Sequence, residues 1–248
     1  MLLIRHLFRQ FKQGVRMAEV FFQGPFGRLE GRFFQSENPK APCVLVLPPN
    51  PAQGGTMNNK VTYAIFQTFV SLGFSALRLN YHGVGHSQGT IDGTGAGELL
   101  DAIAALDWLQ SRDEDSTKCW ITGYSFGAWI SAQVLMRRPE IQGFVFVTPP
   151  TNLYDFTFLS PCPSSGVIIQ GERDPIVDEK TVALLAEQLD LTENINIDYR
   201  VLADTDHFYT NSLKALHDAI IEAIPNLKLK KTKLGKKFAK AIIPNDDY

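Results

Sequence analysis

The segment Lys118-Cys119-Trp120-Ile121-Thr122-Gly123-Tyr124-Ser125-Phe126-Gly127 decides the fold. The apolar run 119–122 predicts a buried strand, and the helical pattern that begins at Phe126 predicts a helix directly after it. Between them, Gly123–Gly127 matches G-x-S-x-G, a pattern that composition alone would place in roughly one in ten chains of this length. The strand and helix on either side make it specific, because that context is a nucleophile elbow.

Glycine is needed on both sides of Ser125 for steric reasons. A serine on a tight strand-to-helix turn adopts a strained backbone conformation, and a side chain at either flank would collide with the neighbouring strand or helix. The small residues Gly127, Ala128, Ser131 and Ala132 would let the helix pack closely on a sheet. The start of that helix also favours negative charge that develops at Ser125.

Strands and helices alternate on both sides of the elbow. An opening antiparallel hairpin is expected at 19–22 and 31–34, around the turn-forming GPFGR. Further strands are expected at 43–47, 74–79, 118–122, 143–147, 167–170 and 195–202, and helices at 61–72, 99–109, 126–136, 182–189 and 213–224. This order predicts an α/β fold: a mostly parallel sheet of about eight strands with helices on both faces.

A serine hydroxyl is a poor nucleophile at neutral pH, so it needs a base, and the base needs an orienting group. His207 follows the strand at 195–202, and Asp174 follows the strand at 167–170. Ser125, Asp174 and His207 therefore occur in the chain order Ser…Asp…His that is typical of a nucleophile elbow. Three other carboxylates, Glu172, Asp204 and Asp206, remain alternative partners for the histidine.

The other chemistry-bearing residues have less specific patterns. His82 and His86 flank a Gly-Val-Gly turn that lacks G-x-G-x-x-G and a following helix, so a turn near the mouth of the site is preferred to a phosphate-binding loop. We expect His6 and His217 to be structural or solvated. The segment 148–166 is too short for a helical cap, so the cap is expected to be minimal. Its aromatic residues Tyr154, Phe156 and Phe158 could line an acyl pocket or pack in the core.

Composition describes an ordinary globular protein, with 44% hydrophobic and 20% charged residues. A net charge of −2 gives no reason to expect nucleic acid as a partner, so a small molecule is the default. The odd number of cysteines (Cys43, Cys119, Cys162) has no metal-ligand spacing, which predicts free thiols, no metal site and a cytoplasmic protein. No stretch approaches the roughly 20 apolar residues of a membrane span, and stable membrane insertion is not expected.

The two ends of the chain differ in composition from the region between them. Residues 1–16 mix basic and apolar residues without the uninterrupted apolar region of a signal peptide, and we expect a frayed extension rather than an amphipathic membrane-surface or targeting helix. Residues 228–248 form a lysine-rich tail that would attract polyanions weakly. The sequence therefore predicts one domain over 17–227 between a basic N-terminal extension and a basic C-terminal tail.

From about Met17 to Leu227 the chain resembles the α/β-hydrolase superfamily, and within it a bacterial dienelactone-hydrolase-like or serine-aminopeptidase-like group. The specific stretch is Gly54–Lys60 (GGTMNNK); similar stretches are Leu79–Ser87, Phe126–Ile130 and Cys162–Gly166. The resemblance departs at Pro48 and Asn50, where the group has histidines, and at His82, where it usually has arginine. It implies a hydrolase with a Ser125, Asp174 and His207 triad but names no substrate.

The expected reaction is hydrolysis of an ester, thioester or small amide through an acyl-enzyme on Ser125, with His207 as base, Asp174 as its orienting group and no cofactor. The oxyanion would bind the N–H of Phe126 and one from the loop after the third strand. Proline has no N–H, which leaves Asn50, or less favourably Ala52. Alternatives are an acyltransferase or small-peptide peptidase with the same triad, and a non-catalytic binding protein on the same fold.

Overall fold

A computed structural model describes residues 17–112, 119–227 and 229 of the 248-residue chain. The N-terminal extension at 1–16 lies outside the described residues. The same holds for the C-terminal tail at 228–248 apart from residue 229. The expected division of the chain at residues 17 and 227 therefore stays a prediction.

Eight strands form one sheet in the order β1-β2-β4-β3-β5-β6-β7-β8. The strand β1 (Met17–Gly24) pairs antiparallel with β2 (Gly27–Phe34), which confirms the opening hairpin, and β2 pairs antiparallel with β4. From β4 onward all neighbours are parallel. The bounds of the parallel strands are β3 (Cys43–Leu47), β4 (Ser75–Leu79), β5 (Cys119–Tyr124), β6 (Ile141–Val147), β7 (Ser165–Gly171) and β8 (Ile197–Leu202).

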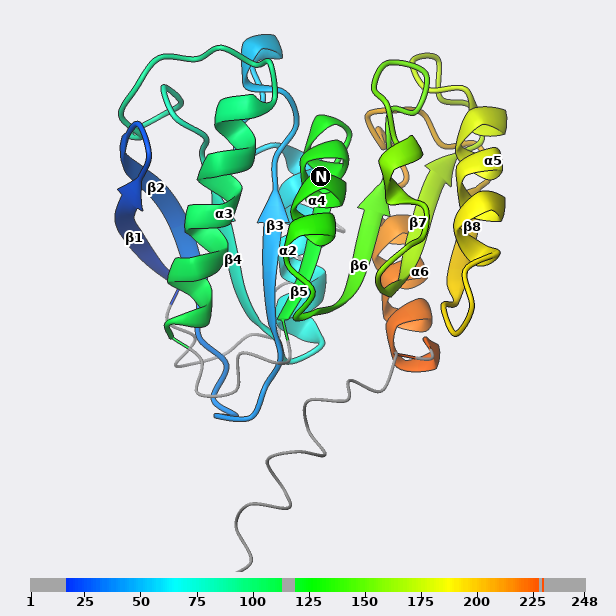
Figure 1. Cartoon of the computed structure of the whole chain (residues 1–248), viewed down its shortest axis with the longest axis horizontal. Helices are drawn as coiled ribbons and strands as arrows, with labels where there is room; N and C mark the ends of the chain where they lie inside the picture. Colours follow the sequence, from blue (N-terminus) through cyan, green and yellow to red (C-terminus); the bar gives the residue numbers. More distant parts are fainter. Residues whose placement is uncertain (1–16, 113–118, 228, 230–248) are drawn as a thin grey trace, which may run out of the picture.

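Five α-helices of the described residues cover the two faces of the sheet (Figure 1). The apolar core on one face includes α3 (Ala96–Gln110), α4 (Phe126–Arg137) and α5 (Glu179–Asp190). The core on the other face includes α2 (Lys60–Ser71) and α6 (Leu213–Asn226). All residues of β3, β4, β5 and β7 are buried, as expected of strands covered on both faces. The predicted α/β architecture, a mostly parallel sheet with helices on both faces, is thus confirmed.

The predicted and observed starts differ by two residues at β6, β7 and β8, and by three or four residues at β2, α3 and α5, which begin at Gly27, Ala96 and Glu179. The strands β6 and β7 begin two residues earlier than expected, at Ile141 and Ser165, and β8 begins two residues later. The apolar pattern does not detect these strand ends because polar residues stand there. Ser164 donates its hydroxyl to the carbonyl of Ile141, and the Ser165 hydroxyl accepts the N–H of Asn196. These hydroxyls are satisfied inside the fold, so the sheet extends past its apolar stretch.

The connection between β6 and β7 carries one short 3₁₀ helix, η3 (Thr157–Leu159), and no α-helix within its described residues. This agrees with the expected minimal cap. Phe156 is buried in the core, whereas Tyr154 and Phe158 are partly buried against it, so of the three aromatic residues Phe156 clearly packs in the core. Among the described residues, no helix has both the length and the apolar character needed to cross a bilayer.

The three cysteines are buried thiols, in agreement with the sequence expectation. Cys43 on β3 and Cys119 on β5 are direct neighbours in the parallel ladder, and their Sγ atoms lie 3.1 Å apart. The two strands that end at the predicted catalytic loops are therefore joined by a close thiol contact.

Candidate active site

Ser125 lies between the end of β5 and the first residue of α4, at the edge of the sheet where the parallel strands end (Figure 1). Its backbone has φ 54° and ψ −121°, a combination that a non-glycine residue adopts only under strain. The N–H of Ser125 donates to the carbonyl of Val147 at the end of β6, at 2.9 Å, which fixes the turn. The elbow expected from the sequence is present in the backbone.

The two glycines of the elbow are required by close backbone approach. A Cβ atom on Gly123 would lie 2.1 Å from the carbonyl oxygen of Gly127. A Cβ atom on Gly127 would lie 2.4 Å from the oxygen of Leu47 and 2.5 Å from that of Pro48. The start of α4 is thus in contact with the loop that follows β3, and this contact brings the N–H side of the elbow beside the expected oxyanion loop.

His207 and Asp174 form a direct hydrogen bond. His207 Nδ1 lies 2.8 Å from Asp174 Oδ2, with side-chain exposures of 6% and 0%. Because a carboxylate can only accept, Nδ1 carries the proton, and Nε2 is left free to exchange a proton with a nucleophile. The pair joins the loops after β7 and β8.

The remaining acceptor sites of Asp174 are also occupied. Its Oδ1 accepts the backbone N–H groups of Ile176 at 2.8 Å and Val177 at 2.9 Å. Its Oδ2 also accepts from the side-chain amide of Gln170 at 3.2 Å. Hydrogen bonds to the charged form stabilise a carboxylate that is shielded from solvent. Asp174 is therefore held in one orientation, facing His207.

The three alternative carboxylates have other partners. Glu172 Oε2 accepts the N–H of Asp204, and Asp204 forms an ion pair with Arg173 at 2.6 Å. Asp206 accepts the N–H and hydroxyl of Thr210, and the hydroxyl bond lowers the pKa of its carboxyl group. The geometry brings Asp174, and none of these three, into contact with the ring of His207.

Tyr124 connects the elbow to His207. Its hydroxyl donates to the backbone carbonyl of His207 at 2.8 Å, and the two rings are 5.5 Å apart. Burial raises the pKa of Tyr124 well above its usual value, so the hydroxyl stays a donor. Ser125 Oγ itself makes no hydrogen bond within the described part of the chain. In the absence of substrate such contacts are often loose, and they tighten in the complex.

The two expected oxyanion donors are Asn50, directly before η1 (Pro51–Gln53), and Phe126, the first residue of α4. Neither the N–H of Asn50 nor that of Phe126 has an acceptor among residues 17–112, 119–227 and 229. The N–H of Ala52, by contrast, donates to Asn50 Oδ1 at 2.8 Å. Since the Ala52 donor is already used, the contacts favour Asn50 over Ala52. The Asn50 side chain also donates to Tyr154 Oη at 3.3 Å.

Two residues near His207 and Asp174 were missed by the sequence analysis, Tyr124 and Gln170. Tyr124 is the variable residue of G-x-S-x-G, and the motif says nothing of its side chain. Gln170 is a fully buried polar residue at the end of an apolar strand. That polar position inside a buried run was a usable signal, because a buried amide needs partners.

The other described histidines make no contact with His207 or Asp174, and His6 lies outside the described residues. His82 is buried and donates its N–H and Nδ1 to Asp101 Oδ2, at 2.8 and 2.6 Å. His217 Nδ1 forms a hydrogen bond with the hydroxyl of Thr68 at 2.8 Å. Of the two roles expected for His217, structural or solvated, this contact supports the structural one. Two groups of three potential metal ligands occur among the described residues: His82, Asp92 and Glu98, and Glu19, Glu30 and His86. Each contains a buried carboxylate that already accepts backbone N–H groups.

The chain was then compared with known proteins. A family model described as X-Pro dipeptidyl-peptidase (S15 family) matches residues 31–227. An uncharacterised protein of Rickettsia prowazekii is 45% identical over 213 residues, which cover 83% of this chain and 89% of that protein. A candidate α/β-hydrolase of unknown function from Agrobacterium tumefaciens is 46% identical in structure-based alignment, with a TM-score of 0.81. That alignment covers 87% of this chain and all of the Agrobacterium chain.

A more distant relative has a named activity. The lysophosphatidylserine lipase of Rattus norvegicus is 25% identical over 174 residues. The match covers 55% of this chain but only 42% of the lipase.

Proposed function

The chain belongs to the X-Pro dipeptidyl-peptidase (S15) family within the α/β-hydrolases, and we propose that it hydrolyses a small ester or thioester through an acyl-enzyme on Ser125. The observation that carries this proposal is the buried His207–Asp174 hydrogen bond, on loops tied to the strained Ser125 by Tyr124. Nucleophilic acyl transfer requires a base with a fixed tautomer within reach of a serine on an elbow, and these contacts support that arrangement.

Each residue has one role in the proposed mechanism. His207 Nε2 takes the proton of Ser125 as Oγ attacks the acyl carbon, and Asp174 stabilises the imidazolium that forms. The N–H groups of Asn50 and Phe126 bind the oxyanion. His207 then protonates the leaving alcohol or thiol, and a water molecule repeats the sequence to release the acid.

Apolar side chains beside the triad support an apolar acyl group as substrate. Phe208, which follows His207, is 52% exposed, and Ile176, whose N–H binds Asp174, is 39% exposed. Leu153 is 59% exposed, and its neighbour Asn152 donates to the carbonyl of Ile176 at 2.8 Å. Exposed apolar groups that gather around a site favour an apolar ligand. The likeness to a lysophospholipid lipase supports the same class.

The decisive experiment is covalent labelling with a fluorophosphonate. The wild-type protein should be labelled on Ser125, and Ser125→Ala should lose both the label and turnover of aryl esters. Ser131→Ala is the matched control, because Ser131 lies on α4 but donates its hydroxyl to Gly127 and is fully buried. Retained turnover in Ser125→Ala would refute the mechanism. Absence of labelling in the folded wild-type protein would favour a non-catalytic binding protein.

A series of aryl esters of increasing acyl length then tests the substrate class. We expect kcat/KM to rise with the first several methylene groups, since each buried CH₂ contributes about 0.8 kcal/mol. If kcat/KM did not change with acyl length, the exposed apolar side chains of Phe208, Ile176 and Leu153 would not belong to the acyl-binding site. Adding an alcohol acceptor in competition with water separates hydrolysis from acyl transfer.

A second candidate activity is cleavage of a small peptide amide. The description of the matching family model favours it, and amide and ester hydrolysis share the same acyl-enzyme intermediate. An X-Pro aryl amide compared with an aryl ester of equal size discriminates between the two. A kcat/KM for the amide that equals or exceeds the value for the ester would make the peptidase the main activity.

A further inference from the structure

Glu98, in the first turn of α3, is a buried carboxylate that the proposed mechanism leaves unused. Its exposure is 0%, and it forms no ion pair with Lys or Arg among the described residues. A buried charge is costly unless hydrogen bonds satisfy it. The groups that satisfy Glu98 therefore indicate what the carboxylate is for.

Both oxygens of Glu98 hold the loop that precedes α3. Oε1 accepts the N–H of Gly93 and Oε2 accepts the N–H of Gly95, each at 2.9 Å. The two glycines have φ of +64° and +101°, so the loop has a conformation that other residues rarely adopt. Glu98 fixes this loop at two points.

The loop at 93–95, which Glu98 holds, packs between the proposed oxyanion loop and α4. A Cβ on Gly93 would lie 2.5 Å from Ala52 Cβ, and a Cβ on Gly95 would lie 2.2 Å from the ring of Trp129. The carbonyl of Gly93 accepts from Asn50 Nδ2 at 3.5 Å. The same Asn50 amide reaches Tyr154, whose ring stacks on Trp129 with centroids 4.4 Å apart. A continuous set of contacts thus leads from Glu98 to Asn50.

We infer that Glu98 is a positioning residue for catalysis, which through Gly93 and the Asn50 side chain holds the Asn50 N–H where the oxyanion forms. The inference rests on the proposed function, because it assumes that Asn50 donates to the oxyanion. A preorganised donor is effective only when it is fixed in place, and a displacement near 1 Å can cost about a hundredfold in rate. A purely structural role, as a cap for α3, would change stability and leave the rate of the folded enzyme alone.

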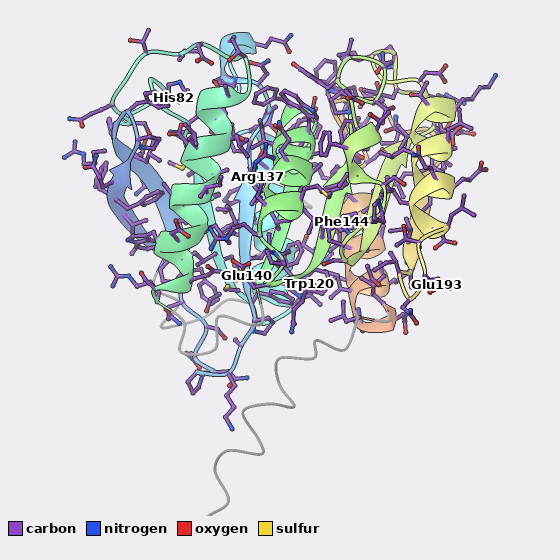
Figure 2. The ribbon with its side chains drawn as sticks, viewed as in Figure 1. His82, Trp120, Arg137, Glu140, Phe144 and Glu193 are labelled. Carbon is purple, nitrogen blue, oxygen red and sulfur yellow. The ribbon has the colours of Figure 1, made fainter. Side chains whose placement is uncertain are left out.

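The main test is Glu98→Gln, with Asp101→Asn as the matched control. Glutamine keeps the size but turns an NH₂ group towards one of the two backbone donors. Asp101 is a second fully buried carboxylate one turn along α3. It holds His82, which lies in a group with Glu98 but has no hydrogen bond to the oxyanion loop, so this control disturbs the same surroundings and leaves the two glycine bonds of Glu98 in place. Figure 2 shows His82 near the start of α3, and Trp120 at the opposite end of the sheet.

At a temperature where all variants are folded, we expect Glu98→Gln to lower kcat on an aryl ester roughly ten- to a hundredfold, with KM nearly unchanged. The inhibition constant of an aryl trifluoromethyl ketone, whose adduct carries the oxyanion, should rise by a similar factor. Asp101→Asn should lose stability and keep its kcat. Normal kcat in Glu98→Gln, or an equal loss in both variants, would overturn the inference.

A double-mutant cycle tests whether Glu98 acts through Asn50. If it does, Glu98→Gln should have little further effect on kcat in an Asn50→Ala background, because the two residues share one set of contacts. Additive losses would overturn the inference. Fluorophosphonate labelling of Ser125 distinguishes failure of this inference from failure of the proposed function. If Ser125 is labelled and Glu98→Gln has normal turnover, only the role of Glu98 is refuted. If Ser125 is not labelled, the proposed function is refuted.

Discussion

Three side chains do most of the positioning around His207. Asp174 binds Nδ1, Gln170 binds the same carboxylate oxygen, and Tyr124 binds the backbone carbonyl of the histidine. All three are shielded from solvent, so their hydrogen bonds are not exchanged with water. Each bond therefore restricts the ring of His207 more than an exposed bond would.

Asp174→Asn is expected to lower kcat about 10⁴-fold with little change in KM, because an amide at this position favours the wrong tautomer of His207 and no longer stabilises the imidazolium. Steady-state kinetics on an aryl ester measures this. Asp206→Asn is the control, since Asp206 binds Thr210 and does not contact the ring. A larger loss in the control would reassign the acidic partner of His207.

Tyr124→Phe tests the link between the elbow and His207. Removing the hydroxyl leaves a buried carbonyl without its donor, so we expect a loss of about 1–3 kcal/mol in unfolding free energy and a several-fold lower kcat. Tyr209→Phe is the matched control, because this buried tyrosine bonds to the Thr148 hydroxyl at 3.0 Å. Urea denaturation and kinetics should show both variants destabilised but only Tyr124→Phe slowed.

At the scale of elements, the site depends on how closely α4 approaches β3. The backbone of Gly127 touches the carbonyls of Leu47 and Pro48, and the buried small residues Ala128, Ser131 and Ala132 keep the rest of the helix against the sheet. This contact places the proposed oxyanion loop beside the elbow. The distance between α4 and β3 therefore affects where the proposed oxyanion donors lie.

Gly127→Ala should disrupt this spacing. The added Cβ would lie 2.4 Å from a backbone oxygen, which cannot move as a flexible side chain could, so we expect a loss of stability above about 2 kcal/mol and strongly reduced turnover. Gly73→Ala is the control: nothing lies within 4 Å of its Cβ, and only its φ of +87° is strained. Urea denaturation should show the smaller loss for Gly73→Ala, with turnover retained.

The contact between α2 and α6 gives a pH-dependent contribution to stability. The Thr68 hydroxyl donates to the carbonyl of Ala64, so His217 Nδ1 donates to Thr68 Oγ1. Burial lowers the pKa of His217 from its ordinary value of 6.5. The unfolded chain then takes up a proton first, and stability falls as pH drops below about 6.5. Urea denaturation at pH 7.5 and 5.5 should show a smaller pH effect in His217→Gln; an unchanged effect would assign it to other groups.

At the scale of the whole molecule, one sheet with two covered faces carries the site on the loops at one end. Both apolar cores consist of residues from Val20 to Leu227. The loops after β3, β5, β7 and β8 supply all the residues assigned to the proposed reaction. The rigid sheet fixes the starting point of each loop, and the loops determine the chemistry.

Deleting residues 1–16 should leave the melting temperature and kcat nearly unchanged, because this segment precedes the predicted domain and its sequence offers no plausible core face. Thermal denaturation and ester hydrolysis of the truncated and full-length proteins provide the test. A fall of several degrees in melting temperature would show that the segment packs on the domain.

The sequence by itself determined the order of elements, because apolar periodicity, capping residues such as Asn59 and the glycines at turns act over a few residues. It also determined that Ser125 stands on an elbow, since Gly123 and Gly127 are local requirements. The starts of β6 and β7, where Ser164 and Ser165 form hydrogen bonds, escaped it, because polar residues at these positions are stabilised by distant partners.

Only the tertiary structure decided which groups face one another. Chain order favoured Asp174 over Glu172, Asp204 and Asp206, but only the fold shows which carboxylate contacts the ring of His207, across 33 positions of the chain. Asn50 likewise forms a hydrogen bond with Tyr154, 104 positions away in the chain. Glu98 can influence Asn50 only because the fold places the loop before α3 against the Asn50 side chain. Such contacts depend on where the sheet and helices place each loop, and no local pattern records that placement.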